Sequence, residues 1–99
     1  MPDAVPGIAE TVAGPRVTLY SAPGCHLCEA ARAGLERLAG RLEFELIEVD
    51  IHSDDTLARR WLLEIPVIEV DGEVATQAPI DLDRARRAIE AAAKAGWRR

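Results

Sequence analysis

The sequence predicts an α/β domain with the element order β-α-β-α-β-β-α, built on a four-stranded mixed sheet flanked by helices. Three observations lead to this fold class. Strand-like and helix-like apolar patterns alternate along the first two thirds of the chain, an Asp-Gly turn signal joins two further strands, and an amphipathic helix follows them. The 99 residues, 48% of them hydrophobic, suffice for one small domain, which we expect over residues 16–99.

The first third of this chain should form a strand, a turn and a helix. Residues 16–20 have the composition of a strand, and Pro23-Gly24 is strong turn punctuation. Apolar side chains recur at spacings of three and four over residues 26–39, which predicts a helix with one buried face. Residues 1–15 contain three prolines and two glycines, so we expect them to be a mobile tail.

The second strand is predicted over residues 42–51, where the apolar side chains alternate and then change phase. We expect both faces of this strand to be covered, although a bulge would also shift the phase. A second helix should begin after Ser53 or Asp54, either of which can cap it, and run to about Leu63. Its buried face is predicted to consist of Leu57, Trp61 and Leu62.

Residues 65–70 and 73–77 are predicted strands joined by Asp71-Gly72, because this dipeptide favours the positive φ angles of a two-residue hairpin turn. The first two strands, which a helix connects, should be parallel with a right-handed crossover. A last helix should start at Asp81 or Asp83. Its outer face is basic, and we favour a solvated face over a partner-docking surface.

Cys25 and Cys28 are the only cysteines, and their spacing at a helix start suits a reversible disulfide. Residues three apart on a helix have Cβ atoms about 5–6 Å apart, and a disulfide needs Cα atoms roughly 4.4–6.8 Å apart. The partial positive charge and free N–H groups of a helix N-terminus favour a thiolate. We therefore expect Cys25, nearer the turn, to be the attacking sulfur and Cys28 to be the resolving sulfur.

Three other uses of the pair carry less weight. A structural staple here would close a very short loop and so add little stability. Zinc needs four ligands, and the chain adds only His26 and His52 as nitrogen donors to the two sulfurs. Two buried and inert thiols are the third alternative, which the spacing behind Pro23-Gly24 disfavours. We therefore expect no metal and no other bound cofactor.

Composition narrows the functional classes. A formal net charge of −5 and a sequence pI near 5.0 argue against non-specific binding to nucleic acid or to an anionic membrane. The sequence contains no run of about 18 apolar residues, so we expect no membrane-spanning helix. The first residues lack the basic and apolar regions of a secretory signal, so the cytoplasm is the expected compartment. A C-x-x-C pair there is more often catalytic or metal-binding than structural.

In this order of elements, the motif Tyr20-Ser21-x-Pro23-x-Cys25-x-x-Cys28 resembles the thioredoxin-like fold and, within it, small glutaredoxin-like proteins. Ile65-Pro66-Val67 before the hairpin adds to the resemblance, which covers about residues 16–95. The resemblance implies a dithiol–disulfide oxidoreductase that exchanges disulfides with protein or small thiol substrates. Cys25 would be its nucleophile and Cys28 its resolving thiol.

The resemblance also implies a cis peptide bond before Pro66, beside the cysteines; a trans proline at the start of an edge strand is the alternative. The cis bond would turn the backbone N–H and C=O of Ile65 outward, where a bound peptide or glutathione could pair with them. Asp81 is the one residue of the segment after the last strand that could hold the γ-glutamyl end of glutathione. His26, if charged, would favour the Cys25 thiolate, or else it points into solvent.

Several positions depart from the glutaredoxin pattern. His26-Leu27 stands between the cysteines, where Pro-Tyr or a similar pair is usual, and Ala22 stands where a lysine usually helps to hold glutathione. The usual Gly-Gly followed by Asp is replaced by the segment 76–81. These departures argue against a complete glutathione site.

As an oxidoreductase the chain would act as a monomer on protein disulfides. It would recover electrons from glutathione or from a flavoprotein reductase, with neither nucleic acid nor a membrane as partner. The competing hypothesis is a binding module of the same fold. Its cysteines would be inactive, or would hold a metal or an iron–sulfur cluster between two chains.

Overall fold

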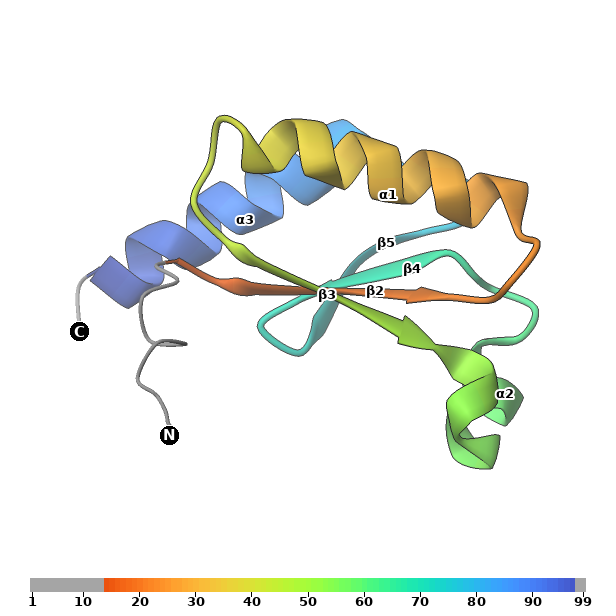
Figure 1. The fold of residues 1–99 in the computed structure, drawn as a ribbon. Coiled ribbons are helices and arrows are strands. Elements are labelled where there is room, and N and C mark those ends of the chain that lie inside the picture. Colours follow the sequence, from red (N-terminus) through yellow and green to blue (C-terminus); the bar gives the residue numbers. More distant parts are fainter. Residues whose placement is uncertain (1–13, 98–99) are drawn as a thin grey trace, which may run out of the picture.

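The computed structural model describes residues 14–97, and its elements follow the predicted order (Figure 1). A short 3₁₀ turn, η2, is the one addition to that order. The elements in sequence are β2 (Arg16–Ser21), α1 (His26–Ala39), β3 (Glu45–Asp50), η2 (Ile51–Ser53), α2 (Asp55–Trp61), β4 (Val67–Val70), β5 (Glu73–Gln77) and α3 (Leu82–Trp97).

The four strands form one mixed sheet in the order β3-β2-β4-β5, which confirms the predicted fold class. Strand β2 lies in the middle of the sheet, parallel to β3 on one side and antiparallel to β4 on the other. Strands β4 and β5 form the predicted hairpin. Its turn has φ angles of 50° at Asp71 and 89° at Gly72, as a two-residue hairpin turn requires.

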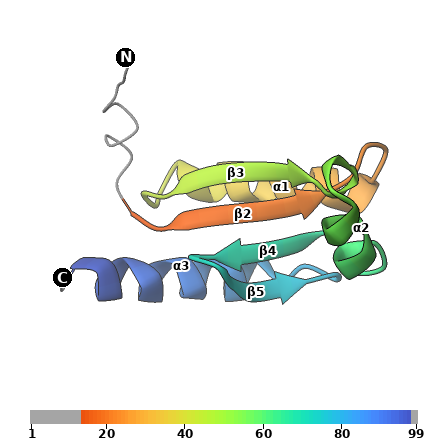
Figure 2. The same ribbon diagram turned by 90° about the horizontal axis from the view of Figure 1, so that it is seen from below.

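The helices are divided unequally between the two faces of the sheet (Figures 1 and 2). Helices α1 and α3 cover one face together, and the short α2 covers only one end of the other face. The main core therefore lies under α1 and α3, and its buried members are Val17, Leu19, Ala31, Leu35, Leu38, Phe44, Ile68, Val70, Ala85 and Ile89. A second cluster beside α2 consists of Ile51, Trp61 and Val67, with Tyr20, Ala22, Leu57 and Ile65 packed against it.

The phase change predicted in the second strand comes from apolar side chains on both sides of the sheet and not from a bulge. Leu46 of β3 packs against the main core, whereas Ile51, in η2, belongs to the second cluster. The register between β2 and β3 runs without a shift, and the irregularity of the sheet lies between Ile68 and Glu69 in the hairpin. The strand itself is shorter than the predicted 42–51, because the chain reaches β2 only at Glu45.

Helix α2 begins as predicted and ends early. The side chain of Asp54 caps it by accepting hydrogen bonds from the first-turn N–H groups of Thr56 and Leu57. The helix ends at Trp61, whose carbonyl accepts from the N–H of Ile65 as the chain turns. Leu62 is consequently 52% exposed, so the prediction that it is buried is wrong.

Of the predicted tail, residues 1–13 lie outside the described residues. Pro15 is buried, and its carbonyl accepts a hydrogen bond from the N–H of Glu45 at 2.9 Å. The packed part of the chain therefore begins before Arg16. Within residues 14–97, no helix has the length and apolar character needed to cross a membrane.

Two leucines allow a matched test of the main core. Leu19, in the central strand, is 0% exposed, whereas Leu63, after α2, is 94% exposed. Leu19→Ala should lower the free energy of unfolding by about 2–5 kcal/mol, because it removes buried methyl groups and leaves a cavity. The same change at Leu63 should stay within about 0.5 kcal/mol. Urea denaturation of both variants measures the difference, and equal losses would contradict the assigned core.

Candidate active site

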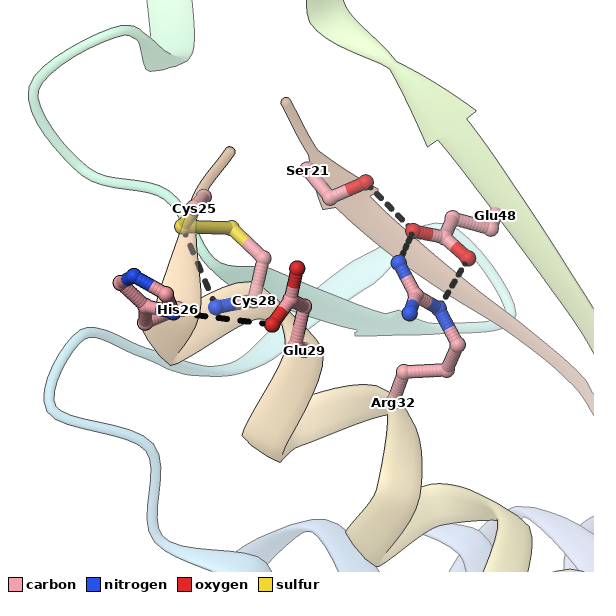
Figure 3. Close-up of a disulfide and its surroundings, with 7 residues drawn as sticks. All are labelled: Ser21, Cys25, His26, Cys28, Glu29, Arg32 and Glu48. Carbon is pink, nitrogen blue, oxygen red and sulfur yellow. Dashed lines mark hydrogen bonds and ion pairs between the residues drawn. A yellow bond between two sulfur atoms is a disulfide. The ribbon is translucent and has the colours of Figure 1, made fainter. Parts of the chain in front are cut away.

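The two cysteines lie where β2 passes into α1, and they form a disulfide (Figure 3). Strand β2 ends at Ser21, and the connecting turn places Gly24 at φ 76°, a conformation that glycine adopts at little cost. Cys25 is the N-cap of α1, and Cys28 lies in the first turn of that helix. Their Cα atoms are 5.2 Å apart, within the range that a disulfide spans.

The surroundings of the two sulfurs differ. Cys28 is 0% exposed and is one of the buried residues of α1, whereas Cys25 is partly exposed at the turn. The Cys25 sulfur accepts a hydrogen bond from the backbone N–H of Cys28 at 3.1 Å, so it takes the position of a capping acceptor. This N–H and the positive end of the α1 dipole would stabilise a negative charge on Cys25 once the disulfide is reduced.

The peptide bond between Ile65 and Pro66 is cis, as the resemblance implied. Pro66 is fully buried and lines a pocket together with Leu27, the residue between the cysteines, so the proline does lie next to the pair. The N–H of Ile65, however, donates to the carbonyl of Trp61 at 3.0 Å. The expectation of an outward N–H is therefore wrong, and only the carbonyl of Ile65 remains for a bound peptide.

His26 and Asp81 have partners of their own. The His26 side chain is 94% exposed, and its Nδ1 lies 3.6 Å from a carboxylate oxygen of Glu29. A role for His26 in stabilising the Cys25 thiolate stays a prediction. The carboxylate of Asp81 accepts from the N–H of Arg84 at 3.1 Å and so caps α3. Contact between Asp81 and a substrate likewise stays a prediction.

Sequence reasoning missed a polar triad that ties three elements together beside the disulfide (Figure 3). Arg32 of α1 makes two hydrogen bonds of 2.6 Å to the two carboxylate oxygens of Glu48 in β3. The hydroxyl of Ser21, the buried last residue of β2, donates to the same carboxylate at 2.7 Å. Opposite charges on a helix and a strand hinted at such a pair, but only the sheet register brings these residues together.

Hydrogen bonds from Arg32 hold the pKa of Glu48 below its usual range; partial burial opposes this effect and the Ser21 hydroxyl adds to it. The carboxylate is therefore ionised over the range in which thiol exchange occurs. Because Ser21 directly precedes the turn that carries Cys25, the triad fixes the point from which that turn departs. None of these hydrogen bonds reaches a sulfur, so any effect of the triad on the cysteines would act through the position of the turn.

The family model described as Glutaredoxin-like domain (DUF836) matches residues 16–90. The chain belongs to this family. The match includes every element from β2 through most of α3, and both cysteines. No curated protein matches the sequence.

Solved structures agree on the fold of this glutaredoxin-like domain. A protein from X. campestris is 32% identical, with 77% of this chain and 97% of that one covered and a TM-score of 0.62. A protein from Nitrosomonas europaea is 24% identical, covers 90% and 99%, and has a TM-score of 0.69. A thioredoxin from Halobacterium salinarum is 21% identical, covers 82% and 76%, and has a TM-score of 0.61. The last two likenesses concern the fold alone.

The described part of one chain does not supply enough ligands for a metal site. Among residues 14–97, no three or more His, Cys, Asp or Glu side chains gather closely enough to hold an ion. His52, one of the two nitrogen donors in the sequence, is exposed in η2. Any site built on the two cysteines would therefore need ligands from outside the described part of the chain.

Glu48 should make stability depend on pH. A carboxyl whose pKa is lower in the folded state contributes stability above its unfolded pKa, and loses it as the pH falls through the folded value. Between about pH 6 and about pH 3, wild type should therefore lose more free energy of unfolding than Glu48→Gln. Denaturant titrations at both pH values measure the gap in free energy of unfolding between wild type and Glu48→Gln. Glu73→Gln in β5 is the control. A gap that does not narrow at low pH would contradict the pairing.

Proposed function

We propose that this glutaredoxin-like domain is a dithiol–disulfide oxidoreductase, with Cys25 as nucleophile and Cys28 as resolving thiol. The observation that carries the proposal is the unequal placement of the two sulfurs. One is buried, and the other is partly exposed and accepts a backbone N–H at a helix start. A purely structural disulfide does not need its two sulfurs to differ in exposure. A two-step exchange needs one accessible sulfur and one protected sulfur.

In the reducing direction, the Cys25 thiolate attacks one sulfur of a substrate disulfide. The substrate S–S bond breaks, a mixed disulfide forms, and the first substrate sulfur leaves as a thiolate. Cys28 then loses its proton and attacks the Cys25 sulfur, which releases the second substrate sulfur as a thiolate. Two electrons have passed to the substrate, and the chain is left with the Cys25–Cys28 disulfide.

The fold assists each step through groups near the pair. The backbone N–H of Cys28 and the α1 dipole would stabilise Cys25 both as attacking thiolate and as leaving group. Burial would keep Cys28 from reacting with other disulfides before the mixed disulfide forms. The carbonyl of Ile65 would accept an N–H of the substrate peptide, and the exposed His26 would lie at the rim of the complex.

The remaining parts of the proposal concern the cell. The chain would act in the cytoplasm as a monomer, on protein disulfides. Its own disulfide would be reduced by glutathione or by a flavoprotein reductase, without a bound metal or organic cofactor.

A redox titration tests the proposal. The protein is equilibrated in thiol–disulfide buffers, alkylated, and its oxidised fraction is read by mass. We expect a reversible two-electron transition between about −180 and −270 mV, the range of the redoxins. A pair that stays oxidised below about −300 mV would indicate a structural bond. A pair that never forms a disulfide would favour the binding-module alternative, and either result would contradict an exchange enzyme.

The roles of the two sulfurs lead to a second prediction. Cys28→Ser should accumulate mixed disulfides with a peptide disulfide substrate, because nothing resolves the first intermediate. Cys25→Ser, the matched control, should accumulate few, because the remaining Cys28 sulfur is buried. Mass spectrometry under non-reducing conditions counts the adducts on each variant. Equal trapping by both would mean that the assignment of nucleophile and resolving thiol is wrong.

A further inference from the structure

A pocket of about 250 Å³ opens beside the disulfide, between the start of α1 and the chain that leads from β5 into α3. Its size is below the roughly 300–1,000 Å³ of sites for drug-sized ligands, so it suits a side chain better than a whole cofactor. Every lining side chain is apolar, and the lining consists of Leu27, Ala30, Ala31, Pro66, Ala78, Pro79, Ile80 and Leu82.

The pocket is connected to the cysteine pair through Leu27, which lines it. Leu27 lies between the two cysteines in sequence and is 63% exposed, so part of its surface is free to contact a partner. Pro66, on the other wall, follows Ile65, whose carbonyl is the proposed acceptor for substrate backbone. A residue next to the attacked cysteine of a substrate would thus be within reach of the pocket while the backbone pairs with Ile65.

The backbone around the pocket has few donors left for an anion. The N–H of Ala78 donates to the carbonyl of Glu64, the N–H of Asp81 donates to the hydroxyl of Thr76, and Pro79 has no N–H. The start of α3, where a helix attracts a carboxylate, already holds the carboxylate of Asp81. A glutathione carboxylate would therefore have to compete with the carboxylate of Asp81 at this position.

Two charged residues that adjoin the lining in sequence have ion-pair partners of their own. Glu29 and Asp83 directly adjoin the lining residues Ala30 and Leu82 in sequence, and their side chains are 57% and 54% exposed. Asp83 is itself paired with Arg86 at 2.6 Å and with Arg87 at 2.8 Å, and Arg86 also pairs with Glu90 at 2.9 Å. The lining thus offers no charged side chain to glutathione, which carries two carboxylates and one ammonium group.

We propose that this pocket receives an apolar side chain adjacent to the reactive cysteine of a protein disulfide, and that glutathione disulfides are poor substrates. The inference rests on the proposed function, because it names the substrates of that same cysteine pair. The occupant is a peptide segment of a partner protein. Its apolar side chain enters the pocket, its cysteine meets Cys25, and no carboxylate is required.

Symmetric disulfides test this, because either sulfur then belongs to the same sequence. The reduced protein is mixed with dimers of two short peptides, one with leucine and one with aspartate next to the cysteine, and with oxidised glutathione. Rates are divided by those of dithiothreitol, which removes intrinsic reactivity. The leucine peptide should react at least about tenfold faster than the other two, which corresponds to about 1.4 kcal/mol.

Variants of the pocket test whether the preference for the leucine peptide arises there. Ile80→Lys and Ala30→Lys place a cation in the lining, and both should lower the leucine-to-aspartate ratio toward one and raise the rate with oxidised glutathione. Ala30 is an exposed position on α1, so its variant should fold even if Ile80→Lys does not. Val74→Lys is the matched control: it adds the same charge at an exposed apolar position of β5, outside the pocket, and should leave the ratio unchanged.

Two results would overturn the inference in different ways. Equal normalised rates for all three disulfides, unaffected by Ile80→Lys and Ala30→Lys, would contradict the apolar subsite and leave the exchange reaction intact. No reaction with any disulfide, together with no reversible transition in the redox titration, would contradict the proposed function and the subsite with it.

Discussion

The position of β2 in the middle of the sheet is the constraint on which the candidate site depends. This strand is hydrogen-bonded to β3 on one side and to β4 on the other, so its end cannot shift without breaking two ladders. The chain leaves it through a short turn and enters α1 at Cys25. The position of the cysteine pair is therefore set by β2, a strand with hydrogen-bonded neighbours on both sides. Cys25, at the end of the turn, remains partly exposed to a partner.

Two different kinds of support hold the base of that turn. On the side of α1, the Arg32–Glu48–Ser21 triad connects the helix, β3 and the end of β2 through charged hydrogen bonds. On the side of α2, Tyr20 packs on Trp61 with ring centroids 5.8 Å apart, and its hydroxyl donates to Glu69. Burial and the Glu69 carboxylate both raise the pKa of Tyr20, so this hydroxyl stays protonated as a donor. A rigid base matters because thiol exchange requires attack along a defined line of sulfurs.

The sequence predicted the elements whose signals are local. The order of the elements, the Asp71-Gly72 turn and the cap by Asp54 follow from residues close in the chain, and the structure contains each of them. Features that depend on distant pairing were missed. The partner of Glu48 depends on sheet register, and the loss of Leu62 from the core depends on where α2 ends. The hydrogen bond from Ile65 to Trp61 depends on that same turn.

The chemistry of the site and its selectivity arise from different parts of the chain. A thiolate at Cys25 would be stabilised by a backbone N–H and by the start of α1, and neither depends on the side chains of the surrounding loops. The surface that the proposed substrate would contact consists of Leu27 and the segment from Ala78 to Leu82. In that segment Pro79, which follows a second cis peptide bond, has no N–H, and the Asp81 carboxylate caps α3. In the proposed scheme, exchange at the cysteine pair and the choice of substrate have no side chain in common, so one could change without the other.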